Sequence, residues 1–317
     1  MMYPRYASRV LILGTIAVFT AAQDCNISNG STLFISSPDD LTQRIQDCPE
    51  INGSIVFETS YNSNIELPNL VTLGGKLSAN LMANNSFIDL PNLERSGDGL
   101  DVVAWNVSAP KLNETLDIEV LAGVVRLDSL VRARNIDVSS EDLSTINLSS
   151  LRNVTQRLHI GHCTDCDTEY EPEHGIRLDF AALQFAGYIH IEGQIRSLLM
   201  PQLTTLGPPY DPGSYMWALD DEDYSAGLLL DLDESPETFE LDLPRLSYVD
   251  THFEISGNVA GYLIFFRGSS SLISAANTCP LQCLTPIPDR NTNRHKSTRS
   301  NRKVLPSLSP PTYLLAI

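Results

Sequence analysis

The sequence predicts an all-β protein whose body, residues 23–285, folds as a right-handed β-solenoid with a short helix at its N-terminal end. Two observations favour this fold. A phrase of the form Leu-Pro-x-Leu recurs about every 20 residues, and the segments between its copies alternate apolar and polar residues. Each coil of such a repeat buries its apolar face only by stacking on its neighbours. We therefore expect a ladder of similar coils.

The recurring phrase indicates a turn between two strands. Proline lacks an N–H group and cannot sit inside a ladder, while the leucine that follows returns the chain to the core. The second positions of the first five copies are 18–23 residues apart. An ordinary β-sandwich, the alternative, spaces its strands about 8–12 residues apart. The seven copies are residues 67–70 (LPNL), 90–93 (LPNL), 109–112 (APKL), 127–130 (LDSL), 148–151 (LSSL), 200–203 (MPQL) and 243–246 (LPRL).

Two sets of alternating runs lie between these turns. Residues 116–119 (LDIE) and 188–192 (YIHIE) exemplify the first set, and residues 105–107 (WNV) and 238–243 (TFELDL) the second. Alternation buries one face of a strand and leaves the other in contact with water. Each coil is therefore expected to contain about two strands and two turns.

One helix is expected, over residues 37–47 (SPDDLTQRIQD). Ser37 is a favourable N-cap, and Pro38 fits the first helical position. Leu41 and Ile45 fall on one face of this helix. The helix precedes the first strand, where a solenoid needs a cap.

Residues 1–22 have the pattern of a secretory signal peptide. Arg5 and Arg9 give a basic start, and the apolar run 10–22 ends in small residues, which predicts cleavage after Ala22. The alternative, a membrane anchor, requires roughly 20 apolar residues, whereas this run has about 13. No later run is long enough to cross a bilayer. We expect an extracellular protein without a transmembrane span.

Cysteines and glycosylation sequons agree with export. An even number of cysteines suggests disulfides, and pairing between sequence neighbours is the simplest arrangement in a solenoid. The pairs would be Cys25 with Cys48, Cys163 with Cys166, and Cys279 with Cys283. Asn-x-Ser/Thr sequons predict N-glycosylation, which requires that each occupied site face solvent. The sequons are Asn26, Asn29, Asn52, Asn84, Asn106, Asn113, Asn147 and Asn153.

Charge is divided between an acidic body and a basic tail. Of the 21 Lys and Arg and the 39 Asp and Glu in the chain, 13 and 38 respectively lie in residues 23–285. An acidic body disfavours binding to nucleic acid or to anionic membrane surfaces, because both repel it. The tail, residues 286–317, is basic, polar and poor in apolar residues, and is therefore predicted to be disordered.

The order of these features resembles a fungal cell-surface family. The start Cys25-Asn26, the helix 37–47 ending at Cys48, residues 53–57 (GSIVF) and the Leu-Pro-x-Leu coils are similar to those of the receptor-L-domain-like, GPI-anchored cell-wall organisation proteins, which include sporulation-specific members. The resemblance covers roughly residues 25–283. It implies a leucine-rich, β-helical L-domain fold, a role in cell-wall integrity, and partners among wall polysaccharides or wall glycoproteins. It brings no catalytic residue with it.

The C-terminus departs from that family. Members end with a Ser/Thr-rich stalk and a GPI-attachment tail of roughly 10–20 apolar residues, whereas the apolar end of this chain is only residues 313–317 (YLLAI). Either this member is freely secreted or its C-terminus is disrupted. The basic, low-complexity tail favours the second alternative.

A group of His and Cys residues is the sharpest chemical candidate, and most of it lies in a first insertion into the repeat, residues 162–174 (HCTDCDTEYEPEH). His159, His162, Cys163, Cys166 and His174 offer the N and S ligands that zinc prefers. In an oxidising compartment a Cys163–Cys166 disulfide is the favoured alternative, with His159 simply facing solvent. We therefore assign neither a metal nor a cofactor to the chain.

A second insertion, residues 207–227, carries the candidate ligand-binding residues. Aromatic side chains can stack on sugar rings while carboxylates bind hydroxyl groups, or the same aromatics can pack the insertion onto the solenoid. The acids at 220–223 also suggest a glycosidase, but consecutive acids in a loop are more often a solvated tip. The candidates are Tyr210, Tyr215, Trp217, Asp221 and Tyr224.

We therefore expect a non-catalytic glycoprotein that supports fungal cell-wall organisation. A glycan- or peptide-binding module that uses residues 207–227 is the first alternative. A β-helical polysaccharide-active enzyme is the second, although the series of Asp-Asp, Gly-His-Gly and Arg-x-Lys motifs found in pectin-cleaving helices is absent from the sequence.

Overall fold

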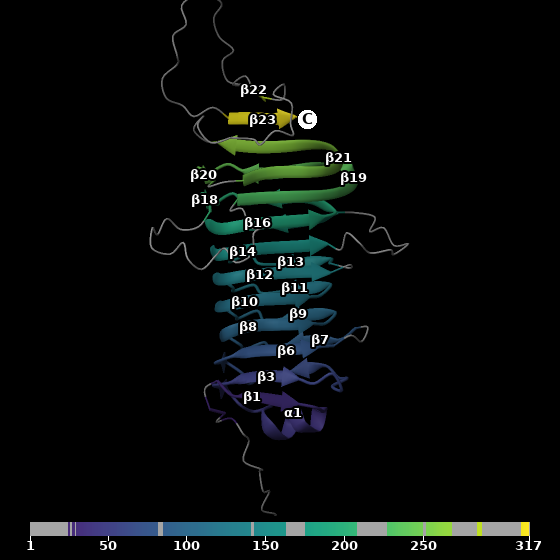
Figure 1. Ribbon diagram of the computed structural model, residues 1–317, viewed down its shortest axis with the longest axis vertical. Helices are drawn as coiled ribbons and strands as arrows, with labels where there is room; N and C mark the ends of the chain where they lie inside the picture. Colours follow the sequence, from purple (N-terminus) through teal and green to yellow (C-terminus); the bar gives the residue numbers. More distant parts are fainter. Residues whose placement is uncertain are drawn as a thin grey trace, which may run out of the picture.

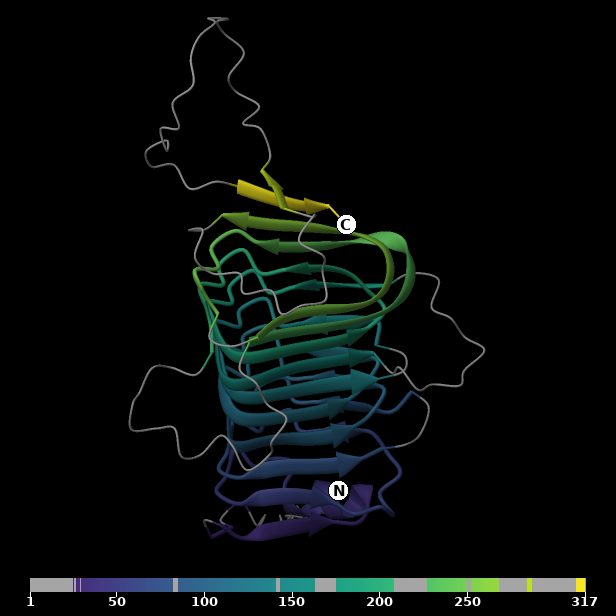
Figure 2. The ribbon, with the colours of Figure 1, turned by 45° about the horizontal axis from the view of Figure 1, so that its top comes forward.

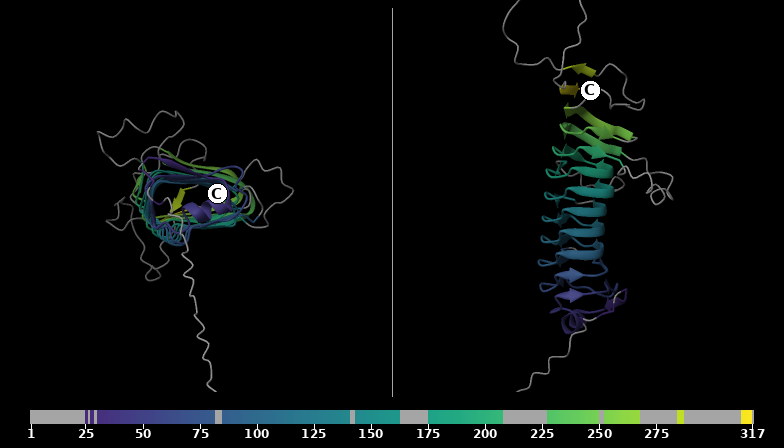
Figure 3. Two further views of the ribbon diagram at one scale, coloured as in Figure 1. Left: turned by 90° about the horizontal axis from the view of Figure 1, so that it is seen from below. Right: turned by 90° about the vertical axis from the view of Figure 1, so that its left-hand side faces the viewer.

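The computed structural model of the chain describes residues 25, 27–28, 30–81, 85–140, 143–162, 175–207, 227–249, 252–267, 284–286 and 312–316. Parallel strands stack one coil on the next into an elongated solenoid (Figure 1). Viewed along the stack, the coils superimpose within one oblong outline (Figure 3). The predicted β-solenoid is therefore confirmed.

The longest series of strands forms one broad side of the solenoid, which we call the front stack. Its inward residues are fully buried from coil to coil, as the paired Leu100, Ile118 and Ile136 illustrate. The strands are β1 (Thr32–Ile35), β3 (Ser54–Phe57), β6 (Lys76–Asn80), the C-terminal parts of β8 (Arg95–Val103), β10 (Glu114–Leu121), β12 (Arg132–Ser140), β14 (Asn153–His162) and β16 (Phe185–Gly193), and the N-terminal parts of β19 (Gly227–Leu243) and β21 (His252–Arg267).

The opposite side is the rear stack. Five of its strands form a separate parallel sheet, and the later ones continue the same series as part of the larger sheet. The rear strands are β4 (Ile65–Glu66), β7 (Phe87–Asp89), β9 (Asn106–Ser108), β11 (Val124–Arg126), β13 (Thr145–Asn147), β15 (Ile176–Asp179), β17 (Ile195–Leu199) and the C-terminal parts of β19 and β21. Figure 2 shows β19 and β21 curving from the front to the rear without a break.

A third, short series lies between the rear and the front in each coil, and we call it the corner stack. It contains β2 (Glu50–Ile51), β5 (Thr72–Leu73), β18 (Thr205–Leu206), β20 (Tyr248–Val249) and the first residues of β8, β10, β12, β14 and β16. The expectation of two strands per coil was therefore incomplete. The corner segments pair over only two residues, which is too short for alternation to mark them in the sequence.

The Leu-Pro-x-Leu phrase forms the turn that joins the rear stack to the corner stack. In all seven copies the N–H of the fourth residue donates to the carbonyl of the first, as from Leu93 to Leu90 at 3.2 Å. The two apolar residues of each turn are buried in the core. Residues 180–183 (FAAL) form an eighth copy, with Leu183 donating to Phe180 at 3.0 Å. Its two alanines gave no turn signal in the sequence.

Helix α1 (Pro38–Arg44) lies at the N-terminal end of the stack (Figure 1), but it follows β1 in the chain, so the expectation that it precedes the first strand was wrong. The Ser37 hydroxyl accepts a hydrogen bond from the N–H of Asp40 at 3.2 Å, and the side chains of Leu41 and Ile45 are buried. The helix ends at Arg44, three residues before the expected end. The chain turns there because the Ile45 carbonyl accepts from the N–H of Cys48, just before β2.

Cys25 and Cys48 form the expected disulfide, with a sequence separation of 23 residues. The bond joins the start of the described chain to the residue that follows α1 and its turn. Cys163, Cys166, Cys279 and Cys283 lie outside the described residues. Within the part of the chain that the structure describes, no helix is long and apolar enough to cross a membrane.

Two short strands come from the C-terminal part of the chain. They are β22 (Leu284–Pro286) and β23 (Thr312–Ala316), and β23 pairs antiparallel to both β21 and β22. Residues 312–316, within the tail that was predicted to be disordered, thus pair with β21 at the edge of the sheet. The tail residues between these two strands are not among those described.

Candidate functional site

The residues predicted to form sites are only partly described. Tyr210, Tyr215, Trp217, Asp221 and Tyr224, from the second insertion, all lie outside the described residues, as do Cys163, Cys166 and His174. The described chain stops at His162 and Gly207 and resumes at Gly175 and Gly227. Of the proposed His and Cys group, only His159 and His162 can be placed.

These two histidines do not belong to one site. Side chains alternate between the two faces of a strand, so His159 points outward from β14, whereas His162 takes the inward parity of Leu158 and Ile160. Both are nevertheless largely covered, with 9% and 6% of their surface exposed. The expectation that His159 simply faces solvent was wrong, because neighbouring side chains on the outer surface enclose it.

His159 belongs to a row of outward residues on the front stack. Backbone register places Asp137 of β12, His159 of β14 and His190 of β16 side by side. Glu192 lies two residues beyond His190 on the same outer face and is paired with Gly161. Three adjacent coils therefore bring two imidazoles and two carboxylates together.

Both ring nitrogens of His159 contact a carboxylate. Its Nδ1 lies 3.0 Å from Oδ1 of Asp137, and its Nε2 lies 3.2 Å from Oε1 of Glu192. The other oxygen of Glu192 lies 3.7 Å from Nε2 of His190. Arg157 donates from Nη2 to Oδ2 of Asp137 at 3.0 Å. The ion pairs and hydrogen bonds run continuously from Arg157 to His190.

Aromatic stacking fixes the two imidazoles relative to each other. The rings of His159 and His190 have centroids 4.8 Å apart and planes inclined by 22°. The ring of Tyr188, two residues earlier on β16, is tilted by 33° to that of His190 at a centroid separation of 6.2 Å. The two rings stack because His159 and His190 are paired in register on adjacent parallel strands.

The surroundings shift the pKa of two of these groups. Burial raises the pKa of Asp137, but the hydrogen bond from His159 and the charges of His159 and Arg157 outweigh it and hold this pKa below its usual value. Burial lowers the pKa of His190, and the neighbouring His159 lowers it further, against the opposing effect of Glu192. These surroundings therefore favour the carboxylate form of Asp137 and the neutral form of His190.

His190 and Glu192 were not predicted from the sequence as partners of His159. The run 188–192 was recognised as a strand, but His159 and Glu192 are 33 residues apart, because residues 163–174 interrupt the period of about 20. Among the described residues, His159, His190 and Glu192 form the group able to hold a metal ion, with ligand atoms all within 4.8 Å of one another.

The glycosylation sequons fall on several surfaces. Asn52 and Asn113 are exposed, whereas Asn106, Asn147 and Asn153 are partly buried. The Asn147 side-chain amide donates to Asp128 in the preceding coil. A glycan on Asn147 would be attached to the same nitrogen, which would keep one N–H. Asn26, Asn29 and Asn84 lie outside the described residues.

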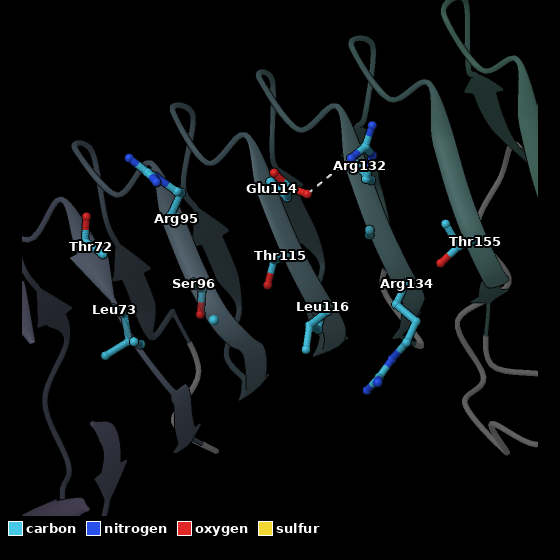
Figure 4. Close-up of a pocket in the computed structure, with 13 residues that line it drawn as sticks. Thr72, Leu73, Arg95, Ser96, Glu114, Thr115, Leu116, Arg132, Arg134 and Thr155 are labelled. Atoms are coloured by element: carbon cyan, nitrogen blue, oxygen red, sulfur yellow. Dashed lines mark ion pairs between the residues drawn. The ribbon is translucent and has the colours of Figure 1, made fainter. Parts of the chain in front are cut away.

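A groove of about 390 Å³ runs across the coils where the corner stack meets the front stack (Figure 4). Arginines line it from β8 and β12, two coils apart, and Leu116 of the intervening β10 is 42% exposed there. Glu114 pairs with Arg132 at 3.5 Å along its rim. Because the strands repeat from coil to coil, the groove follows the long axis of the solenoid. The arginines are Arg95, Arg132 and Arg134.

Comparison with known proteins assigns the chain to no family. No family model matches it, and no match is found among curated proteins or solved structures. The fold, the row of outward residues and the groove are therefore the features that bear on function.

Proposed function

We propose that the chain is a non-catalytic, secreted or cell-surface glycoprotein that supports cell-wall organisation in a fungus. The expected signal peptide, the sequons and the Cys25–Cys48 disulfide support export. The cell-wall role and the fungal origin are inferred from the resemblance to wall-organisation proteins. The observation that carries the proposal is the continuous parallel front stack from β1 to β21.

Such a stack suits a supporting or binding role. Each coil contacts mainly its neighbours, so the solenoid extends without requiring a single compact core. Its sides present rows of side chains at a regular spacing of about 4.8 Å, which matches the repetitive character of a polymer laid along the surface. The groove lined by Arg95, Arg132 and Arg134 follows that direction. Partners of this class would be wall polysaccharides or wall glycoproteins.

Deletion of the encoding sequence tests the wall function. Cells without the protein should become more sensitive to dyes that bind wall polysaccharides, and the full chain should restore resistance. A matched complementation with the Cys25→Ser/Cys48→Ser chain would show whether the Cys25–Cys48 disulfide at the N-terminal end contributes to dye resistance. Unchanged dye sensitivity in a clean deletion would argue strongly against a role in the wall.

A glycan- or peptide-binding module is the second candidate. Of the described ends of the second insertion, Gly207 lies on the corner stack and Gly227 on the front stack. Gly227 pairs with Tyr188, two residues before His190. The described end of the insertion at Gly227 is therefore close to the outward row of polar side chains. A glycan array should give different binding profiles for the full chain and for a chain in which residues 208–226 are replaced by a short linker. Identical profiles would remove this candidate.

A further inference from the structure

The outward row on the front stack has the ligand chemistry of a metal centre. We propose that His159, His190 and Glu192 bind a divalent transition-metal ion of the zinc and copper class. This activity is independent of the proposed wall function. Imidazole nitrogens with a single carboxylate suit these metals, whereas calcium and magnesium prefer sites made of oxygen ligands.

The three ligand atoms are already close together. They lie within 4.8 Å of one another, and Glu192 contacts His159 at 3.2 Å and His190 at 3.7 Å. Zinc binds nitrogen and oxygen ligands at about 2.0–2.2 Å. Side-chain rotations that let the Glu192 carboxylate move aside would bring all three ligands around one ion without moving the strands.

The surroundings of His159 are those of a metal ligand. Asp137 occupies the Nδ1 side of the ring at 3.0 Å, which fixes the ring orientation and leaves Nε2 facing Glu192, with His190 stacked on the ring. Arg157 in turn holds Asp137. Metal-ligating histidines usually donate a hydrogen bond from the N–H of their second ring nitrogen to such a carboxylate, and this partner raises the basicity of the ligand. A simple surface ion pair does not require this series of contacts from Arg157 through Asp137 to His159.

Gly161 provides the space that Glu192 uses. A Cβ atom at residue 161 would lie 2.8 Å from Oε1 of Glu192 and 3.5 Å from Cε1 of His159. Because the contact is with the end of a flexible side chain, Gly161→Ala should displace the carboxylate without disturbing the strand. It therefore tests the position of the ligand and not only its identity.

Three protein ligands leave at least one coordination position open. The side chains of His159, His190 and Glu192 are 11%, 22% and 30% exposed, so that position faces the outer surface. Asp231, the exposed acid paired with Glu192, adds negative charge beside the site. The net acidic charge of the body further favours a cation. The ion would thus remain accessible to water or to an external ligand.

Metal binding by the purified full chain tests the proposal. After chelator treatment and dialysis, titration calorimetry should show one zinc ion bound per chain and no comparable binding of magnesium. His190→Asn and Glu192→Gln should each weaken zinc binding at least tenfold. Asp137→Asn, which removes the negative charge beside Nδ1 of His159 and the ion pair with Arg157 but no proposed ligand, should weaken it by about 10- to 100-fold. Gly161→Ala should also weaken it.

Two matched controls separate this site from other sources of zinc binding. Glu119→Gln removes an exposed acid in the same outward row, two coils from His159, and should leave affinity unchanged. Replacing Cys163, Cys166 and His174 together should also leave it unchanged. Circular dichroism would verify that each variant is folded. Cobalt substitution gives a second readout, because the visible absorption of the bound ion should change in Glu192→Gln.

The proposal fails under any of three outcomes. These are no zinc binding by the full chain, full affinity in both His190→Asn and Glu192→Gln, or loss of binding when Cys163, Cys166 and His174 are replaced. None of these outcomes bears on dye sensitivity, so the metal site and the wall function can fail separately.

Discussion

Gly99 packs directly against Asp117, its partner in the next coil. A Cβ atom at residue 99 would stand 1.7 Å from the carbonyl oxygen of Asp117, and Gly99 has a φ of 123°, which side-chain-bearing residues rarely adopt. The residue lies in β8 where the corner stack bends into the front stack. The bend and a close approach of two coils therefore occur at one residue that only glycine suits.

Gly99→Ala should strongly destabilise the solenoid. The left-handed conformation and the forced separation of two backbones should together lower the free energy of unfolding by about 2–5 kcal/mol. Gly30→Ala is the matched control, since Gly30 also has a positive φ, of 80°, but no atom within 4 Å of the added Cβ. It should cost only about 1–2 kcal/mol. Equal losses in urea denaturation would show that the contact with Asp117 has no energetic role.

Leu112 and Leu116 allow the contribution of the buried turn leucines to stability to be tested within one coil. Leu112 closes a turn and is fully buried, whereas Leu116 lies in the groove and is 42% exposed. Leu112→Ala should reduce the free energy of unfolding by about 2–5 kcal/mol, because it leaves a cavity in the stack. Leu116→Ala should change it by less than about 0.5–1 kcal/mol. Comparable losses in the two variants would contradict the burial of the turn leucines.

The Cys25–Cys48 disulfide should stabilise mainly the N-terminal end. For a loop of 23 residues the chain-entropy contribution is about 3 kcal/mol. The Cys25→Ser/Cys48→Ser variant should therefore show faster hydrogen exchange in α1, β1 and β3. Because repeats depend chiefly on their neighbours, amides in β12 and β14 should keep their protection. Equal loss of protection along the whole stack would contradict this local role.

Local sequence signals were sufficient to predict the coil. The Leu-Pro-x-Leu turn and the alternation of strands such as β16 depend on residues close in sequence, and both occur where expected. The turn at 180–183 was missed because Ala181 and Ala182 carry none of the turn chemistry of proline. The corner stack was missed because its paired segments, such as β5, are too short to show alternation.

The candidate metal site could not be predicted in the same way. His159 was selected for its proximity in sequence to His162, yet strand parity places the two on opposite faces. Its partners, His190 and Glu192, come from the next front strand, and the interruption at 163–174 hides the register that joins them. Backbone pairing between coils, which no local pattern encodes, brings these side chains together.

The cap of α1 gives the last prediction. Ser37 accepts a hydrogen bond from the N–H of Asp40 at 3.2 Å, which satisfies one of the free donors at the helix start. Ser37→Ala should lower the free energy of unfolding by about 1 kcal/mol, as is typical when an N-cap is removed. Ser36→Ala, one residue earlier and exposed, should change it little, because the hydrogen bonds of Ser36 with Asp40 and Ser60 use its backbone N–H and carbonyl groups. Because α1 lies at the end of the stack, the loss should appear as earlier unfolding of α1 in hydrogen exchange, and unchanged protection there would show that the cap does not stabilise this end.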